Sequence, residues 1–585
     1  MRHLFVFLTL STIQFFSAFV SANTVSANKG FYLDPNAKFH PVFANHGMVV
    51  SQEKIASKVG ADILAAGGNA VDAAVATGFA LAVTLPRAGN IGGGGFMLVY
   101  LADKKKTLAI DYREMAPAAA YKNMFLTVDG EVDSNKARYS VHSAGVPGTV
   151  AGLIYAQQKY GRLTLAETIK PAINLARHGF EVSPDLSDSL RSRYDRLRKQ
   201  PSTKKYFYKA DGGFYMPGDR FYQSDLGATL ARIGAYGVDG FYKGTTAGLI
   251  VNQMQNTGGL ITLEDLASYR VVEREPVCGK YRSISLCAMP PPSSGGVHLL
   301  QMLNMLENWE LSKFPHNSAA HLHLMIEVMR QAYADRSLYL GDPDFVPVPT
   351  IELISKQYAS KLSALIDSQN ARSSAAILPS LHILDANLPV ESPETTHFSV
   401  WDSEGNIVSN TYTLNLSYGS GIAVEGAGFL LNNEMDDFAS KPGVPNAYGL
   451  IGGAANAIEG FKRPLSSMTP TIVFDSEGMP ILATGSPGGS TIITIVLQMI
   501  INMVDYKMGV AEATAAPRIH HQWLPDRLFY ETGISSDSLK LLESMGHNLQ
   551  DKPRVLGATQ SISWDGGRLQ GASDPRRHGG AAAAY

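Results

Sequence analysis

The alternation of apolar and polar residues in the first part of the chain predicts two helices followed by two strands. The pattern over residues 51–66 predicts a helix that ends at Gly67-Gly68. Residues 71–83 are small and apolar nearly all round, which predicts a second helix that is buried. Two short apolar stretches, 96–100 and 107–112, flank a polar turn and predict a strand–turn–strand unit. Further helices are expected at 149–159, 319–334, 490–504 and 537–545.

Three repeats of an apolar run, a turn and a second apolar run in the last third of the chain predict β-hairpins. Each turn contains Asp and Gly, which is a good hairpin signal. The expected strand pairs are 397–401 with 406–414, 469–474 with 479–484, and 559–564 with 568–571. Helices, a hairpin, a long helical middle and then hairpins around a buried helix favour antiparallel sheets covered by helices over a parallel βαβ fold.

The two cysteines of the chain lie on a fourth predicted hairpin, with strands at 277–281 and 284–288. Counting back from the turn places Cys278 opposite Cys287, at a Cβ separation that suits a disulfide. Two cysteines are too few for a cysteine-rich metal site or a disulfide scaffold. We therefore expect one disulfide, which requires an oxidising compartment.

Residues 1–27 have the features of a signal peptide. A short positive head precedes an apolar run over residues 4–20, and small-residue cleavage sites follow, one after Ala22 and one after Ala27. The alternative is a transmembrane anchor, but the run is barely long enough and polar residues dilute it. We expect a cleaved leader and a mature protein that is soluble and either periplasmic or secreted.

Charge and motif searches disfavour several classes of function. The 585 residues carry 50 basic and 52 acidic side chains, a net charge of −2, which gives no electrostatic reason to expect nucleic acid or an anionic membrane as partner. The sequence contains no HExxH motif, and its neighbouring histidines lack helical ligand spacing, so no metal site is expected. The glycine run at 92–95 lacks the ending of a phosphate-binding loop, and we expect a tight turn with close backbone approach there. A GxSxG serine motif is absent as well.

A Thr-Thr pair at the start of a predicted strand, deep inside the chain, gives the most specific chemical signal. Threonines favour strands, so the sequence Glu394-Thr395-Thr396-His397 is unremarkable alone. It becomes specific together with other motifs in order: GNAVDAA (68–74), DYRE (111–114), TYTLN (411–415), LNNEMDDF (431–438), RPLSSMTP (463–470), TGSPGGS (484–490) and GASDPR (571–576). Across almost the whole mature chain, this set resembles the γ-glutamyltranspeptidases, which are N-terminal-nucleophile hydrolases.

The resemblance implies an α+β fold, a four-layer αββα sandwich of two antiparallel sheets covered by helices, and a chain that cuts itself. A threonine hydroxyl is a poor nucleophile until a base takes its proton, and the α-amino group at a chain start, with a pKa of roughly 7.7–8.0, can do so. The Glu394–Thr395 bond is therefore the expected cleavage site. A large piece, 28–394, and a small piece, 395–585, are expected to stay together as a heterodimer, with no metal or organic cofactor.

The resemblance also assigns catalytic roles to individual residues. Thr395 is the expected nucleophile, and Thr413 is expected to hydrogen-bond its hydroxyl. The backbone N–H groups of Gly488 and Gly489 are expected to hold the oxyanion, because glycine permits the close approach that this requires. Tyr448 belongs to a segment, 441–449, that resembles the lid over the glutamyl pocket of many bacterial members.

A γ-glutamyl group carries a free α-carboxylate and a free α-ammonium, and the resemblance assigns ligands to both. The expected ligands are Arg113, Ser466 and Ser467 for the carboxylate, and Asn415, Glu434 and Asp437 for the ammonium. Some members have Gln at the position of Glu434, which is expected to change the affinity for the amine but not the reaction.

The implied reaction is acyl transfer in two steps. Thr395 takes the γ-glutamyl group from glutathione or a related amide, and water or the amine of an amino acid or dipeptide then removes it. A cephalosporin (β-lactam) acylase of the same fold is the nearest alternative, but its substrates lack the α-ammonium and have less use for Asp437. A periplasmic amino-acid-binding protein is an alternative from another class, and it would remain a single chain.

Overall fold

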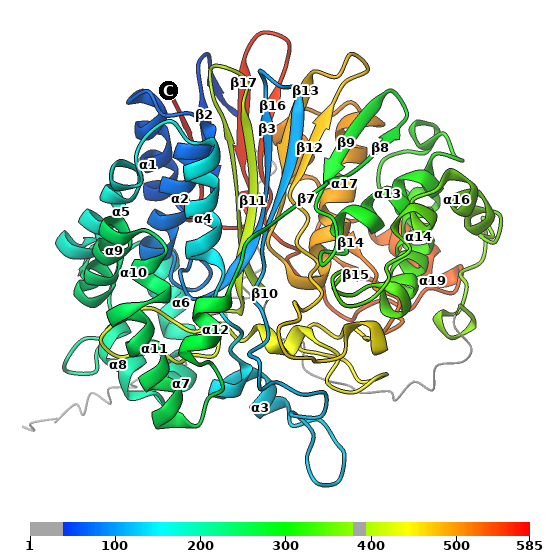
Figure 1. Ribbon diagram of the computed structural model, residues 1–585. Coiled ribbons are helices and arrows are strands. Elements are labelled where there is room, and N and C mark those ends of the chain that lie inside the picture. Colours follow the sequence, from blue (N-terminus) through cyan, green and yellow to red (C-terminus); the bar gives the residue numbers. More distant parts are fainter. Residues whose placement is uncertain (1–38, 378–392) are drawn as a thin grey trace, which may run out of the picture.

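The computed structural model describes residues 39–377 and 393–585. The predicted signal peptide, 1–27, lies outside the described residues. Two large antiparallel sheets form the centre of the molecule, and helices cover the outer face of each (Figure 1). The αββα sandwich expected from the resemblance is confirmed.

The first sheet has the strand order β18-β2-β10-β11-β3-β4-β7. Its strands are β18 (Ala581–Ala584), β2 (Met48–Ser51), β10 (Pro393–Trp401), β11 (Ile407–Leu416), β3 (Gly94–Leu101), β4 (Lys106–Tyr112) and β7 (Val272–Arg274). The second sheet has the order β1-β17-β16-β13-β12-β9-β8. Its strands are β1 (Val42–Ala44), β17 (Leu569–Ser573), β16 (Gln560–Trp564), β13 (Pro480–Thr484), β12 (Thr471–Phe474), β9 (Ile284–Ala288) and β8 (Val277–Tyr281). Each of the predicted hairpins is present, with ends shifted by at most a few residues.

The helices on the first sheet bury their apolar faces against β2, β3, β10 and β11. The main ones are α1 (Lys54–Ala65), α2 (Ala70–Thr84), α4 (Thr149–Tyr160), α5 (Leu165–His178) and α9 (Ser224–Tyr236). Further helices in this half are α3 (Ser134–Tyr139), α6 (Pro184–Ser192), α7 (Tyr194–Leu197), α8 (Pro201–Phe207), α10 (Asp239–Tyr242), α11 (Gly244–Thr257) and α12 (Leu263–Ser268). All residues of α2 are buried, as its uniformly apolar sequence predicts.

The helices on the second sheet pack against β9, β12 and β13. They are α13 (Gly295–Leu306), α14 (Ala319–Tyr339), α15 (Thr350–Leu353), α16 (Lys356–Ser363), α17 (Ile492–Val504), α18 (Val510–Ala515) and α19 (Ser536–Ser544). The inner faces of the two sheets share a third apolar cluster, in which the rings of Tyr100 and Phe474 meet edge to face with centroids 5.3 Å apart.

Two predicted helix boundaries were wrong. The first helix begins at Lys54 instead of residue 51, because residues 48–51 form β2 and the side chain of Glu53 caps the helix by accepting the N–H groups of Ile55 and Ala56. Helix α14 continues to Tyr339, five residues beyond the predicted end. This extension brings one more side chain to the site described below.

Both sheets contain strands from before and after residue 394. In the first sheet, β10 pairs with β2 and β11 pairs with β3. In the second, β12 pairs with β9 and β17 pairs with β1. Because backbone hydrogen bonds of both sheets join the two parts of the chain, a cut at residue 394 leaves each part dependent on the other for its sheets.

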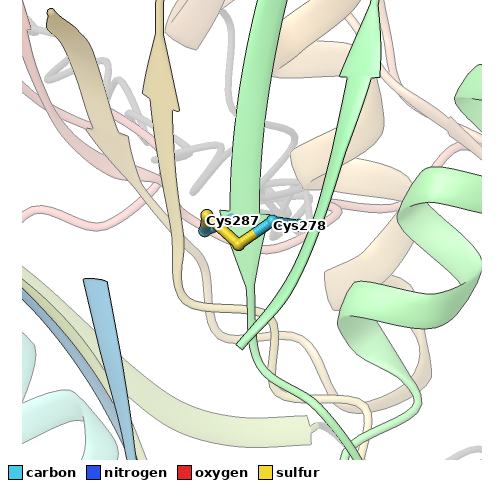
Figure 2. Close-up of a disulfide and its surroundings, with 2 residues drawn as sticks. All are labelled: Cys278 and Cys287. Atoms are coloured by element: carbon cyan, nitrogen blue, oxygen red, sulfur yellow. A yellow bond between two sulfur atoms is a disulfide. The ribbon is translucent and has the colours of Figure 1, made fainter. Parts of the chain in front are cut away.

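The cysteine hairpin has the predicted register. Cys278 of β8 lies directly opposite Cys287 of β9, with Cα atoms 4.1 Å apart, and a disulfide joins the two residues (Figure 2). The bond links neighbouring strands at the edge of the second sheet, and β9 continues inward to pair with β12.

Candidate active site

Thr395 lies on β10, in the middle of the first sheet, and its side chain faces that of Thr413 on β11. The two residues are partners in the β10–β11 ladder, whose register shifts between Pro393 and Thr395. The Thr395 hydroxyl donates to the Thr413 hydroxyl at 3.3 Å, and the Thr413 hydroxyl donates to the carbonyl oxygen of Glu394 at 3.3 Å. A third contact fixes Thr413, since the backbone N–H of Asn415 donates to its hydroxyl at 2.8 Å. An irregularity in a strand pair is a common device for re-aiming a side chain at an active site.

The glycine run at 92–95 allows β3 to approach β11 closely. A Cβ atom on Gly93 would lie 2.0 Å from the carbonyl oxygen of Thr413, so only glycine fits. The side chain of Asn90 completes this contact by donating to the Thr413 carbonyl and accepting from the N–H of Gly93, both at 2.9 Å. The run therefore has the structural role that the sequence predicts, and Asn90 is a supporting residue that the sequence analysis missed.

Gly488 and Gly489 lie between β13 and α17. Both have positive φ, +142° and +56°, a conformation that glycine adopts without a Cβ penalty. Gly489 opens the short turn Gly489–Thr491 that leads into α17, and it lines the same cavity as Thr395. The first N–H groups of a helix have no partner within the helix and carry partial positive charge, which suits a developing oxyanion. Gly488 precedes this turn and is not among the residues lining the cavity.

One cavity brings together most of the residues assigned from the sequence. Its lining contains Arg113, Thr395, Thr413, Asn415, Glu434, Asp437, Tyr448, Ser466, Ser467 and Gly489. Four further lining residues were not predicted: Arg336, Leu450, Met468 and Ile492. The lining thus combines the threonine pair, charged groups of both signs and a few apolar side chains.

The guanidinium of Arg113 is fully buried at the centre of a carboxylate cluster. It forms ion pairs with Glu434, with Asp437 at 2.6 Å and with Glu114 at 3.4 Å. Its Nε also donates to the carbonyl of Pro464 at 3.2 Å. Arg113, a predicted ligand of the carboxylate, thus contacts Glu434 and Asp437, two predicted ligands of the ammonium. Three acidic groups surround one basic group.

Burial governs the titration of this cluster. Burial lowers the pKa of Arg113, but Glu434, Glu114 and Asp437 outweigh that effect and raise it above its ordinary value. Burial raises the pKa of Glu434 well above its ordinary value and that of Glu114 to about 7, although Arg113 opposes both shifts. Glu114 and Glu434 therefore bind protons at a higher pH than exposed carboxylates do.

Ser466 and Ser467 also line the cavity. The backbone of Ser466 is tied to the loop before α13, because its carbonyl accepts both the N–H and the hydroxyl of Ser294 at 2.8 Å. The hydroxyl of Ser466 accepts the N–H of Met468 at 3.1 Å. The hydroxyl of Ser467 accepts a hydrogen bond at 3.2 Å from the guanidinium of Arg336.

Tyr448 lines the cavity and contacts Asn415. Its hydroxyl donates to the backbone carbonyl of Asn415 at 2.8 Å and lies within hydrogen-bond distance of the side-chain oxygen of the same residue. Asn415 has φ +76°, an uncommon conformation for a residue other than glycine, and its amide donates to the Asn433 carbonyl at 2.8 Å. The predicted lid residue is thus buried and fixed to the end of β11.

Comparison with known proteins places the chain in a family. A family model described as Gamma-glutamyltranspeptidase matches residues 56–584. The chain belongs to the γ-glutamyltranspeptidase family. It is 52% identical over 539 residues to the glutathione hydrolase proenzyme of Escherichia coli (strain K12), with 92% of each chain covered.

Solved structures of this family and of an acylase share the fold of this γ-glutamyltranspeptidase-family chain. A cephalosporin acylase from Bacillus halodurans matches with a TM-score of 0.80 at 27% identity, over 94% of this chain and 99% of that chain. The γ-glutamyltranspeptidase of Helicobacter pylori matches with a TM-score of 0.55 at 47% identity, over 57% of this chain and 96% of that chain.

A second buried group of titratable side chains in this family member lies away from the cavity. His323 and Glu327 of α14 and His547 offer possible metal-ligand atoms within 4.8 Å of one another. The ring nitrogens of His323 and His547 are hydrogen-bonded at 2.7 Å, and the Glu327 carboxylate is paired with Arg330 and Arg372. Two guanidiniums beside the carboxylate oppose a metal cation there, so the group serves as an ion-pair and hydrogen-bond network. No sequence motif indicates this group, because His547 is far from α14 in the chain.

In the two described ranges of the chain, no helix is long and apolar enough to cross a bilayer.

Proposed function

We propose that the chain cuts itself between Glu394 and Thr395 and then transfers γ-glutamyl groups through Thr395. The observation that carries this proposal is the hydrogen-bonded sequence from the Thr395 hydroxyl through Thr413 to the Glu394 carbonyl oxygen. The Thr413 hydroxyl contacts both the hydroxyl oxygen of Thr395, which attacks, and the carbonyl oxygen of Glu394, the group that is attacked. Membership of the family and the proenzyme name of the Escherichia coli relative support the proposal.

The processing step follows from this geometry. The hydroxyl oxygen of Thr395 attacks the carbonyl carbon of Glu394, while the Thr413 hydroxyl donates to the carbonyl oxygen as negative charge develops there. The bond from that carbon to the nitrogen of Thr395 breaks, the nitrogen takes up the proton lost by the hydroxyl, and an ester remains. Water then opens the ester and leaves a carboxylate on Glu394 and a free α-amino group on Thr395.

Turnover uses the free α-amino group that processing leaves on Thr395. The α-amino group of Thr395 takes the proton of its own hydroxyl, which then attacks the γ-carbonyl of the donor. The N–H groups at Gly488 and Gly489 hold the oxyanion, the α-ammonium of Thr395 passes its proton to the donor nitrogen, and the donor amine leaves as the γ-glutamyl ester forms. Water, or the amine of an amino acid or peptide, attacks the γ-glutamyl ester and regenerates Thr395. Glutathione and related γ-glutamyl amides are the donors, and no metal or organic cofactor takes part.

The charged lining of the cavity supports a γ-glutamyl substrate. Arg113, Ser466 and Ser467 are assigned to the α-carboxylate, and Asn415, Glu434 and Asp437 to the α-ammonium. Small zwitterionic donors match a cavity with buried groups of both signs. The substrate of a cephalosporin acylase lacks the ammonium and offers no cationic group to Asp437, which makes that activity the second candidate. Membership of an enzyme family argues against an amino-acid-binding protein.

Export and assembly complete the proposal. The leader, 1–27, is removed after Ala22 or Ala27, the protein is periplasmic or secreted, and the pieces 28–394 and 395–585 remain together as a heterodimer. The pairing of strands from both pieces within each sheet supports their staying associated. The disulfide between Cys278 and Cys287 agrees with an oxidising compartment.

Cleavage of a γ-glutamyl anilide, with and without a dipeptide acceptor, tests this function. The matched probe is a glutaryl anilide, which keeps the chain length and the terminal carboxylate but lacks the α-ammonium. We expect rapid release of aniline from the γ-glutamyl compound, faster release with the dipeptide, and little from the glutaryl compound. Preferential cleavage of the glutaryl anilide would instead assign the acylase activity.

A further inference from the structure

A second buried arginine, Arg336, lines the cavity from the last turn of α14. Its side chain differs from that of Arg113 in its partners. The Nε atom donates to the Ser294 hydroxyl at 2.9 Å, and the Nη2 atom donates to the Ser467 hydroxyl at 3.2 Å. Within residues 39–377 and 393–585, no carboxylate lies within ion-pair distance of this guanidinium, whereas Arg113 has three such neighbours.

The hydrogen bonds of Arg336 determine the direction of the serine hydroxyls. A hydroxyl has one proton to donate, and a guanidinium can only donate. Ser294 accepts from Arg336 and sends its proton to the carbonyl of Ser466 at 2.8 Å, which fixes the backbone of that residue. Ser467 also accepts from Arg336, and in the described part of the chain its own proton has no acceptor. That proton is free to point into the cavity.

The charge balance of the cavity gives Arg336 a second effect. Arg113 faces Glu114, Glu434 and Asp437, so an incoming carboxylate meets an arginine that already has acidic partners. Burial lowers the pKa of Arg336, but a guanidinium keeps its charge at any ordinary working pH. Arg336 therefore adds a positive charge that no carboxylate of the described residues neutralises by direct contact.

We propose that Arg336 is a positioning residue for the α-carboxylate of the donor, holding the Ser467 hydroxyl as a hydrogen-bond donor and supplying positive charge behind it. This inference rests on the proposed γ-glutamyl transfer and goes beyond it by adding a determinant of specificity. Arg336 donates to the Ser467 hydroxyl, so it acts through that serine, and its loss is expected to affect only those donors that carry the carboxylate.

Two anilide donors test this role: one with a free α-carboxylate and one in which that group is a neutral carboxamide. For Arg336→Gln, kcat/KM with the carboxylate donor is expected to fall roughly 10- to 100-fold, in line with the loss of a charge-assisted hydrogen bond, while the carboxamide donor changes much less. Arg336→Lys, which keeps the charge but not the planar fork, is expected to restore part of the difference. Equal losses with both donors overturn the proposal, because a merely structural role affects both.

Two further variants keep the test decisive. Arg518 is equally buried, is paired with Asp574 and lies outside the cavity lining, so Arg518→Gln is expected to leave the ratio between the donors unchanged. If Arg336→Gln fails to fold or to process, Ser294→Ala takes its place, since it releases the Nε contact without removing a lining residue. It is expected to give a smaller loss in the same direction, and an unchanged ratio overturns the proposal. A wild-type protein inactive on both donors refutes the proposed function itself.

Discussion

The side chain of Glu394 is held by two arginines in the uncut chain, and we expect these contacts to speed processing. Its carboxylate lies 3.3 Å from Nε of Arg87 and 3.2 Å from Nη2 of Arg577. The side chain of Arg87 is 3% exposed and that of Glu394 is 7% exposed, so water screens their interaction little. Because the carbonyl of Glu394 is the group attacked, fixing this side chain also fixes the scissile bond opposite Thr413.

The structure sets the size of the effect of Glu394→Ala. Removing one partner of a buried pair is most damaging when the other charge is left alone, but Arg87 keeps a second ion pair with Asp185. The loss is then that of a charge-assisted hydrogen bond, about 1.5–3 kcal/mol. If that energy positions the carbonyl in the transition state, processing slows roughly 10- to 100-fold. Glu394→Gln keeps the shape of the side chain but not its charge, and its processing rate is expected to lie between those of the wild type and Glu394→Ala.

A time course of chain cutting after cell-free synthesis, followed on a denaturing gel, measures this rate. The control is Glu404→Ala, because Glu404 pairs with Arg162 at the surface, is 54% exposed, and such pairs contribute little. We expect the control to be cut at the wild-type rate. Processing of Glu394→Ala at the wild-type rate would refute the role of the arginine contacts.

Three further results are expected from the same structure. Asp437→Asn is cut normally but loses about 2–5 kcal/mol of transition-state binding for γ-glutamyl donors, seen mainly as a higher KM, and a wild-type KM would exclude Asp437 as the ammonium ligand. Burial raises the pKa of Glu114 to about 7 and that of Glu434 still more clearly above the ordinary 4.5, so the folded chain retains protons that the unfolded chain releases. The free energy of unfolding in urea, measured for the wild type relative to Glu434→Gln, should therefore fall as pH rises from about 4.5 through 7, and a rise of this difference over that range would contradict the reasoning. Reduction of the disulfide between Cys278 and Cys287 opens a short loop and should lower the free energy of unfolding by about 2–3 kcal/mol, while two reactive thiols in unfolded, unreduced protein would show that the bond does not form.

Local sequence signals predicted most strands of the two central sheets and six of the helices. The Asp- and Gly-containing turns define hairpins by themselves, and each predicted strand pair is present with an antiparallel register. The register of the cysteine hairpin could be counted from its turn, which placed Cys278 opposite Cys287. The predicted start of helix α1 was too early because the residues of β2 lie just before the helix in the chain. The arrangement of the strands into two mixed sheets depends on distant pairing, and only the resemblance to a family predicted it.

The residues that the sequence did not reveal are those that reach the site through tertiary packing. Arg336 lies beyond the predicted end of α14 and meets Ser467 from a segment more than a hundred residues earlier in the chain. Asn90 lies beside a glycine run that has no catalytic pattern of its own. The sequence also did not reveal that Arg113 forms ion pairs with Glu434 and Asp437. The expected ligands of the carboxylate and of the ammonium therefore contact each other in the uncut chain.

The most direct test is the N-terminal sequence of the small piece, determined for the wild type and for two variants of Thr395. We expect the wild-type piece to begin at Thr395, Thr395→Ala to remain one inactive chain, and Thr395→Ser to be cut more slowly and to keep some turnover, because serine retains the hydroxyl but loses the methyl group that restricts it. Thr396→Ala, the matched control, should still be cut before residue 395. A small piece that begins at Thr396, or an uncut and active Thr395→Ala chain, would contradict the proposed mechanism.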